Sequence, residues 1–405
     1  MLNPSRTRSL FVVALVTLAI VSPAAARTFE DTINGIFLVG GADLGTDIAG
    51  TVIRDLAVRG TDLPSASSNP GFRFMFNDEL QLMERETSLG SVFGEQTRTI
   101  GRGNIEIGAS FLYGVLNEID GSEVLAATDV DLITDQGNVF NDSVTITDFS
   151  LESSFFNFFL TYGLTDRWDV NAVVPLVYSK LDVDWAFAQT EVDPQSEEVV
   201  RFQTGRRTPT ENAFGVGDVR LRTKYRFRDE GPVTLATVLE VRAPTGEEEN
   251  FQGLGDWTVT PALVASAPIL RHSVYGTIGT EINADALDRS RLRYSVGMSV
   301  QVFDWVACLV DIMGSSGFTE QEVDLGGLPA GVARTDVALD VPGASFNRSL
   351  TKAELDRTDL IDIAMGFKFD IANVLVAYAG VIVPLTDDGM RAEVLPALRF
   401  DVPLK

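Results

Sequence analysis

Cysteine and histidine are nearly absent from the 405 residues, which contain only Cys308 and His272. One cysteine excludes a disulfide framework within the chain, so backbone pairing and burial must supply the stability. Metal sites built from histidine and cysteine are excluded as well, and no acyl-transfer motif lies near His272. We therefore predict no metal site, no cofactor and no enzymatic activity, with an all-carboxylate catalytic site as the alternative.

Basic residues are also scarce: 32 lysines and arginines stand against 57 aspartates and glutamates, for a formal net charge of −25. Because phosphate contacts need a basic face, this balance excludes nucleic acid as a partner. Hydrophobic residues at 45% and charged residues at 22% suit a large globular domain as well as a membrane protein, so composition alone selects no fold.

Long apolar runs are missing, since no stretch reaches the roughly 18 consecutive apolar residues of a spanning helix. At the start of the chain, Arg6 and Arg8 precede a short apolar run at 11–21 and an Ala-x-Ala site. This order is typical of a secretory signal peptide, residues 1–26; the alternatives are a buried helix and a membrane anchor. The remaining chain is then either soluble outside the cytoplasm or a membrane-spanning barrel.

Apolar and polar residues alternate with a period of two along most of the chain from about residue 100. In residues 214–228 the apolar residues share one face and the basic residues share the other, which a helix would not allow, so we predict an extended strand. In a second segment, Phe149, Leu151 and Phe159 define the apolar face and Glu152 the polar one. The pattern predicts twelve strands: 105–113, 149–159, 168–179, 214–228, 232–243, 257–270, 273–284, 291–302, 305–314, 361–369, 373–385 and 391–402.

The connections between these strands alternate between short and long. This alternation is typical of outer-membrane barrels and is not expected of a soluble β-sandwich. The short ones lie at 163–167, 229–232, 271–272, near Asp304 and at 370–373. The long ones lie at 119–142, 182–212, 244–256, 285–290, 315–356 and 386–390. We therefore predict an all-β fold, a transmembrane antiparallel up-and-down β-barrel over residues 100–405, with acidic loops outside the cell and both termini in the periplasm.

Residues 27–99 do not share the alternation. Helical spacing predicts a short helix at 46–59, and alternation of Phe72, Phe74 and Phe76 with polar residues predicts one short strand. This segment could plug or narrow the lumen, dock beneath the barrel, or form a periplasmic flap without a special role.

The polar face of each strand is expected to line the lumen. The candidates for lumen-lining residues are Arg220, Arg222, Lys224, Arg226, Arg242, Arg291, Arg293, Glu106, Glu152 and Glu240. Ladders of arginine and lysine favour anions in a pore, whereas internal pairing with the acids would still leave a wet, polar interior. We favour pairing for most of them because an unpaired buried charge is costly.

Several short motifs carry a family resemblance. They are Gly215-Val216-Gly217-Asp218-Val219-Arg220-Leu221-Arg222-Thr223-Lys224-Tyr225-Arg226-Phe227, Arg242-Ala243-Pro244-Thr245-Gly246, Gly253-Leu254-Gly255, Gly71-Phe72-Arg73-Phe74, Ser91-Val92-Phe93-Gly94-Glu95 and Thr99-Ile100-Gly101-Arg102-Gly103. Together they resemble the outer-membrane β-barrel family named for the meta pathway of phenol degradation. One departure is the ending, because barrels of this kind usually finish on an aromatic residue, whereas here five residues follow Phe400.

The resemblance implies an outer-membrane channel or transporter for small molecules, aromatic or hydrophobic compounds among them. The expected partners are outer-membrane lipid and lipopolysaccharide, the barrel-assembly machinery and a small-molecule solute. The alternative function is a structural or surface-interaction barrel with acidic extracellular loops and no transport activity.

Overall fold

The structure is a computed structural model. It describes residues 91–405 except 120, 124–126, 135–138, 194–195, 197, 270–271, 325–331, 341–343, 347–351, 356, 373 and 405, and before them residues 28–29, 32, 38–39, 42–43, 67, 72–77 and 82–87. The expected signal peptide and the expected helix at 46–59 lie outside the described residues.

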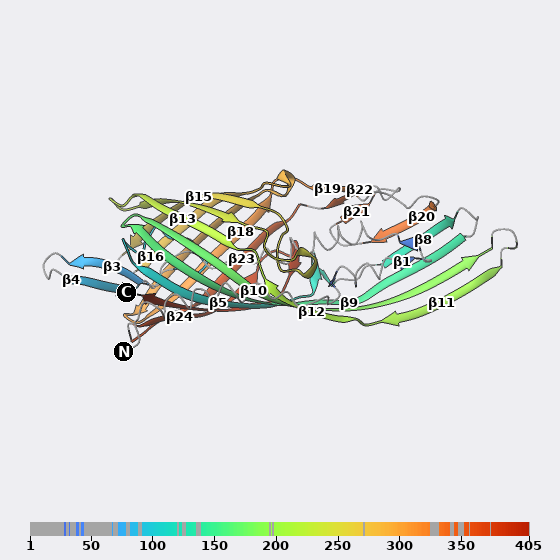
Figure 1. The fold of residues 1–405 in the computed structure, drawn as a ribbon, viewed down its shortest axis with the longest axis horizontal. Helices are drawn as coiled ribbons and strands as arrows, with labels where there is room; N and C mark the ends of the chain where they lie inside the picture. Colours follow the sequence, from blue (N-terminus) through green and yellow to red (C-terminus); the bar gives the residue numbers. More distant parts are fainter. Residues whose placement is uncertain are drawn as a thin grey trace, which may run out of the picture.

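A closed antiparallel barrel of twelve strands forms the body of the part of the chain that the structure describes (Figure 1). The strands are β5 (Ile105–Leu116), β9 (Val139–Thr165), β10 (Trp168–Val192), β13 (Arg220–Arg228), β14 (Thr234–Arg242), β15 (Thr258–Ile269), β16 (His272–Asn283), β17 (Arg291–Phe303), β18 (Val306–Gly317), β23 (Asp359–Ile371), β24 (Leu375–Pro384) and β26 (Leu395–Leu404). Each strand pairs with the next, and the pairings of β26 with β5, β5 with β9 and β9 with β10 close the ring. The barrel of twelve strands predicted from the alternation is confirmed, although of the strand predicted at 214–228 only residues 220–228 belong to β13. The closing strand β26 contains Phe400 and continues to Leu404.

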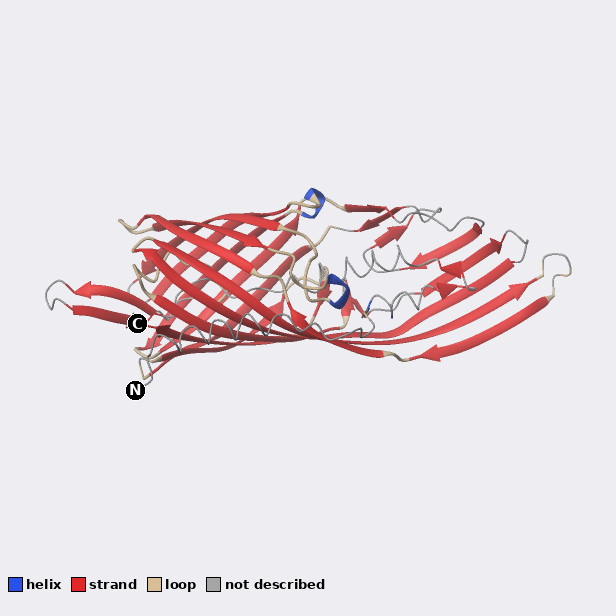
Figure 2. Ribbon diagram, viewed as in Figure 1, coloured by secondary structure: helices blue, strands red, loops and turns tan. Residues whose placement is uncertain are grey.

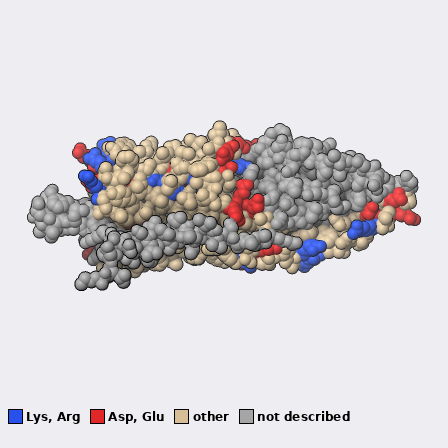
Figure 3. Space-filling model, in the orientation of Figure 1, with Lys and Arg blue, Asp and Glu red and all other residues tan. Residues whose placement is uncertain are grey.

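The outer wall of the barrel is apolar because alternate residues of each strand point away from the interior. Leu221, Leu263 and Ile278 are 58%, 58% and 55% exposed, values that a water-soluble protein would rarely tolerate as a continuous wall. Figure 3 shows this mostly uncharged wall between a charged rim at one end and an acidic rim at the other. These features fit a barrel whose outer face contacts lipid. No helix within the described part of the chain is long and apolar enough to span a membrane.

The short connections lie together at one end of the barrel, as the alternating phase predicts. Outward aromatic side chains gather at this end: Trp168 pairs across the strands with Tyr225, and Trp305 stacks between Phe303 and Phe369. At the opposite end, longer connections carry the two short 3-10 helices η2 (Glu248–Asn250) and η3 (Leu287–Arg289) (Figure 2).

The prediction of irregular loops at 119–142 and 182–212 is wrong. β9 and β10 contain 27 and 25 residues, far more than the roughly 9–11 needed to cross a bilayer, and continue beyond the barrel as a paired extension (Figure 1). The extension also contains β8 (Ala127–Thr134) and β11 (Val199–Arg207), and β12 (Thr210–Val216) leads back into the barrel. The acidic residues suggested loops, but alternation continues through them: Val183 and Trp185 remain buried, while Asp184 pairs with Arg206 on the other face.

Further short strands surround these elements. They are β1 (Leu38–Val39), β2 (Ala42–Asp43), β6 (Glu118–Ile119), β7 (Ser122–Glu123), β19 (Gln321–Asp324), β20 (Val332–Asp340), β21 (Ala344–Phe346), β22 (Lys352–Leu355) and β25 (Met390–Arg391). The strand predicted at 72–76 corresponds to β3 (Phe72–Asn77), which pairs with β4 (Leu82–Thr87) in a hairpin beyond the short-turn end (Figure 1).

The interior of the barrel has an apolar side and a charged side, although single buried charges also occur on the strands of the apolar side, such as Glu106 on β5 and Arg399 on β26. On the apolar side, β5, β9, β10, β24 and β26 supply the buried residues Leu112, Leu116, Leu151, Leu181, Ile382 and Leu395. On the charged side, β13, β14, β16 and β17 turn arginine, lysine and glutamate inward. The expectation that only polar faces line the lumen is therefore wrong for β9, where Phe149, Leu151 and Phe159 are buried and Phe156, Phe158 and Leu160 are exposed on the outside.

A candidate binding pocket in the barrel interior

The basic side chains of β13 lie on its inward face, because the residues between them, Leu221, Tyr225 and Phe227, are exposed on the outside. Arg222, Lys224 and Arg226 are buried, and Arg220 is half-buried. The strand begins at a break in the sheet: β12 and β13 both pair with β10, and the intervening Gly217 donates its backbone N–H to the carbonyl of Pro175 at 2.9 Å.

Neighbouring strands bring most of the other predicted lumen residues to the same side. Their partners are acidic residues close by: Arg242 contacts Asp218, in the break before β13, at 2.8 Å, and Arg293 contacts Glu281 of the adjacent strand β16 at 2.7 Å. Arg222 donates a hydrogen bond to Glu240, the residue directly opposite it in the β13–β14 pairing. Arg291 contacts Glu281 at 3.7 Å, and Glu106 is buried on the inward face of β5. Pairing of charges thus describes these residues better than an open ladder of cations.

Glu152 is the exception and does not line the lumen. It shares the outward face of β9 with Phe156 and Phe158, keeps 35% of its side chain exposed and contacts Lys180 at 3.4 Å. The inward face was assigned incorrectly because β9 has phenylalanines on both faces, Phe155 and Phe159 inward and Phe156 and Phe158 outward. Its polar residues therefore could not identify the inner side.

Residues 91–100 cross the interior and contact inward-facing side chains of the wall. Glu95 lies 3.0 Å from the Nζ atom of Lys224, which also donates to the backbone carbonyl of Gln96 at 3.0 Å. Near one end of this segment, the hydroxyl of Ser91 donates to Asp311 at 3.0 Å. At the other end, the backbone N–H of Ile100 donates to Asp169 at 2.9 Å. These contacts hold the segment to both the β13 side and the β18 side of the barrel.

Asp218 joins several parts of the charged side at the end where β13 begins. Its buried carboxylate accepts hydrogen bonds from Nε of Arg242 at 2.8 Å, from the backbone N–H of Gly246 at 3.0 Å and from that of Leu254 at 2.8 Å. The sequence placed Asp218 on the polar face of its strand, but nothing in the sequence indicated that it would join the strand break to the loop that contains η2.

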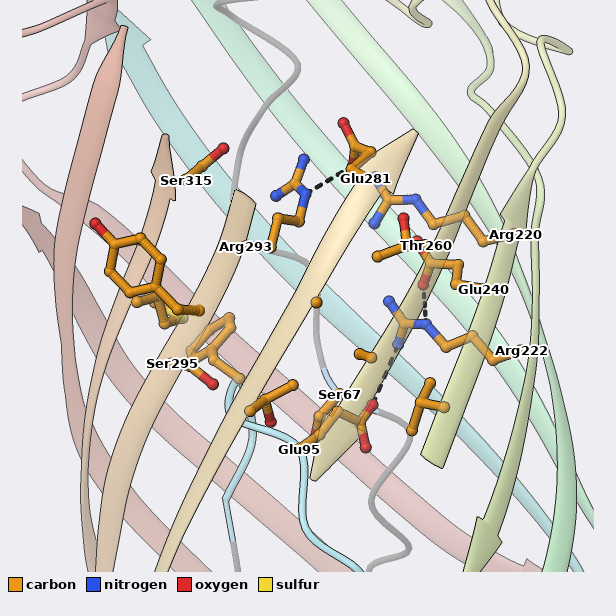
Figure 4. A pocket seen from close by; sticks show the side chains of 18 of the residues that line it. Ser67, Glu95, Arg220, Arg222, Glu240, Thr260, Glu281, Arg293, Ser295 and Ser315 are labelled. Atoms are coloured by element: carbon orange, nitrogen blue, oxygen red, sulfur yellow. Dashed lines mark hydrogen bonds and ion pairs between the residues drawn. The ribbon is translucent and has the colours of Figure 1, made fainter. Parts of the chain in front are cut away.

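A pocket of about 170 Å³ lies in the charged side of the interior (Figure 4). Charged side chains line one part of it, with Arg222 between Glu95 and Glu240, and Arg293 against Glu281. Its other lining includes Thr277, Ser315, Val238, Ala262, Met313 and Leu360. The sequence predicted the arginines and Glu240 but not Glu95, Thr277 or Ser315, since small polar residues and a residue outside the barrel strands carry no distinctive pattern.

The model of the family described as "Putative MetA-pathway of phenol degradation" matches residues 134–286, which include β9–β16. The resemblance noted from the sequence motifs is confirmed over these residues. No curated protein matches the chain.

Solved structures that are similar to this chain include an outer-membrane channel, COG4313, from Pseudomonas putida F1, with 13% identity over 78% of this chain and 100% of that chain, and a TM-score of 0.49. The toluene transporter TodX from P. putida has 8% identity over 77% of this chain and 96% of that one, with a TM-score of 0.36. A FadL homologue from Pseudomonas aeruginosa has 8% identity over 74% of this chain and 89% of that one, with a TM-score of 0.31.

Proposed function

We propose that the protein is an outer-membrane channel or transporter that passes small molecules, aromatic or hydrophobic compounds among them. The observation that carries this proposal is a closed barrel with an apolar outer wall and an interior that combines paired charges with a pocket. Paired charges keep an interior hydrated without a large net field, which suits the passage of small solutes. The family match over residues 134–286 supports the same function.

We also propose that the protein is exported and inserted into the outer membrane. Residues 1–26 act as a signal peptide that is removed on export, and the barrel-assembly machinery inserts the chain into the outer membrane. The short turns then face the periplasm, and the extension of β9 and β10 faces outward, where it meets lipopolysaccharide. The chain has no enzymatic activity in this proposal.

Residues 27–99 narrow the lumen in this proposal. Support comes from residues 91–100, where Glu95 pairs with the buried Lys224 and Ser91 bonds to the buried Asp311. Twelve strands enclose a lumen between the filled eight-stranded size and the open porin size, so a segment inside it decides how much passes.

Single-channel conductance in planar bilayers tests the function. The exported chain is expected to give small discrete conductance steps, and a variant lacking residues 27–99 is expected to give larger ones because the lumen is then wider. A gel shift on heating, which distinguishes folded from unfolded barrels, serves as the control for folding of both proteins. Absence of conductance and of solute uptake into vesicles with either folded protein would refute the channel.

One observation favours a second candidate function, a structural or surface-interaction barrel. The interior contains a hydrophobic cluster that joins Phe29, Val92 and Phe251 to the wall, and a well-packed interior would oppose flow. Under this alternative the exported chain and the variant lacking residues 27–99 both fold but give no conductance in bilayers. The isolated barrel still binds a surface partner through its extension.

A further inference from the structure

Three residues that line the pocket each contribute one polar atom that is buried without a hydrogen-bond partner in the described part of the protein. These atoms are Nε of Arg220, Oγ1 of Thr277 and Oγ of Ser315, from β13, β16 and β18. Buried polar atoms in proteins are almost always bonded, so unbonded ones on residues that line a single cavity point to a ligand for that cavity. Figure 4 shows Arg220 and Ser315 on different walls of the pocket.

Arg220 differs from the other arginines of the charged side. No hydrogen bond or ion pair joins it to any described residue, whereas Arg222 pairs with Glu240, and Arg242 pairs with Asp218. In the β13–β14 pairing, Arg220 stands directly opposite Arg242. Like charges placed opposite each other destabilise a sheet. Asp218 pairs with Arg242, and Glu240 attracts Arg220, but neither carboxylate forms an ion pair with Arg220, so its guanidinium is left to bind an anion.

The rest of the pocket limits which anion fits. Val238, Ala262, Met313 and Leu360 supply an apolar wall, and the volume of about 170 Å³ is close to the roughly 150 Å³ of an apolar cavity that holds benzene. Glu95, Glu240 and Glu281 also line the pocket and would repel a multiply charged ligand. A planar carboxylate matches the fork of a guanidinium, so a monocarboxylate is the anion that suits Arg220.

We propose that this pocket binds a small monocarboxylate with an apolar body of about one aromatic ring, and that the guanidinium of Arg220 binds the carboxylate. The inference rests on the proposed channel function and names its substrate class. The acid group would be held on the β13 side, and the apolar body would lie against Val238 and Met313.

Isothermal titration calorimetry of the full exported chain in detergent, with benzoate as the probe, tests this assignment by measuring the dissociation constant. Benzoate is expected to bind saturably, and Arg220→Gln is expected to weaken it roughly 10- to 100-fold, the usual effect of losing a charge-assisted hydrogen bond. Methyl benzoate keeps the ring without the charge, so its affinity should be the same for both proteins. Arg228→Gln, at the exposed end of the same strand, is the matched control and should bind benzoate like the unmodified chain.

The outcomes separate the two proposals. No saturable binding of benzoate to the unmodified chain, or an Arg220→Gln affinity within twofold of it, overturns the carboxylate site. Both variants must retain the heat-induced gel shift of a folded barrel. If the chain conducts in bilayers but does not bind benzoate, the inference fails and the channel stands; if it binds benzoate through Arg220 but neither conducts nor supports uptake, the pocket stands and the channel fails.

Discussion

Asp218 provides the sharpest test of how the charged side of the barrel is held together. Asp218→Ala removes the acceptor of three hydrogen bonds, from Arg242, Gly246 and Leu254, and leaves the guanidinium of Arg242 buried without its partner. Removing one member of a buried ion pair typically costs about 3–5 kcal/mol. We expect the free energy of unfolding to fall by about that amount, measured by urea titration of the barrel in lipid vesicles.

A double-mutant cycle distinguishes the pair from a general loss of packing. Arg242→Met alone should also destabilise the barrel, because Asp218 then keeps only its two backbone donors. The double variant should cost less than the sum of the single ones by about 1.5 kcal/mol or more, as close charge pairs do. A loss below about 1 kcal/mol for Asp218→Ala, the range of an exposed ion pair, would refute the reasoning.

Two further substitutions test the wall and a close contact, both by the same unfolding titration. Leu263→Arg places a charge on the outer wall and should lower the free energy of unfolding by about 2–4 kcal/mol if the site faces the middle of the bilayer. The control Phe202→Arg, on the extension, should lower it by about 0.5 kcal/mol or less. Equal losses for the two variants would contradict the membrane placement. Gly163→Ala should lower the free energy of unfolding by about 1–3 kcal/mol because its Cβ would lie 1.9 Å from the carbonyl oxygen of Gly101. Gly276→Ala should lower it clearly less, because the nearest atom to its Cβ, the carbonyl oxygen of Ser295, is 3.3 Å away. The reverse order would be inconsistent with this packing.

Much of the barrel could be predicted from the sequence because its strands alternate strictly. Each of β13, β17 and β26 has charges on one face and apolar residues on the other, so period and side are both visible without a structure. The prediction failed where that separation fails. In β9 phenylalanines occur on both faces, so the orientation of Glu152 was assigned incorrectly, and beyond Leu181 charged residues on one face concealed the continuation of β10.

The candidate site was predictable only in part. Arg220, Arg222 and Arg293 follow from the alternation, as does the expectation that most buried charges are paired. Their partners do not follow, because Glu95 comes from a segment without a strand pattern, and Asp218 acts across a strand break. Within the described residues Arg220 has no hydrogen bond or ion pair, whereas Arg222 and Arg242 have one, and this difference depends on which side chains of neighbouring strands meet.

The sequence by itself determined the class of fold, the number of strands and the end at which the short turns lie, because each of these depends on local period and spacing. Only the tertiary structure decided which charges pair, where the pocket opens and which residues share it. Those outcomes depend on closure of the sheet, since the pairing of β26 with β5 brings residues hundreds of positions apart into one interior.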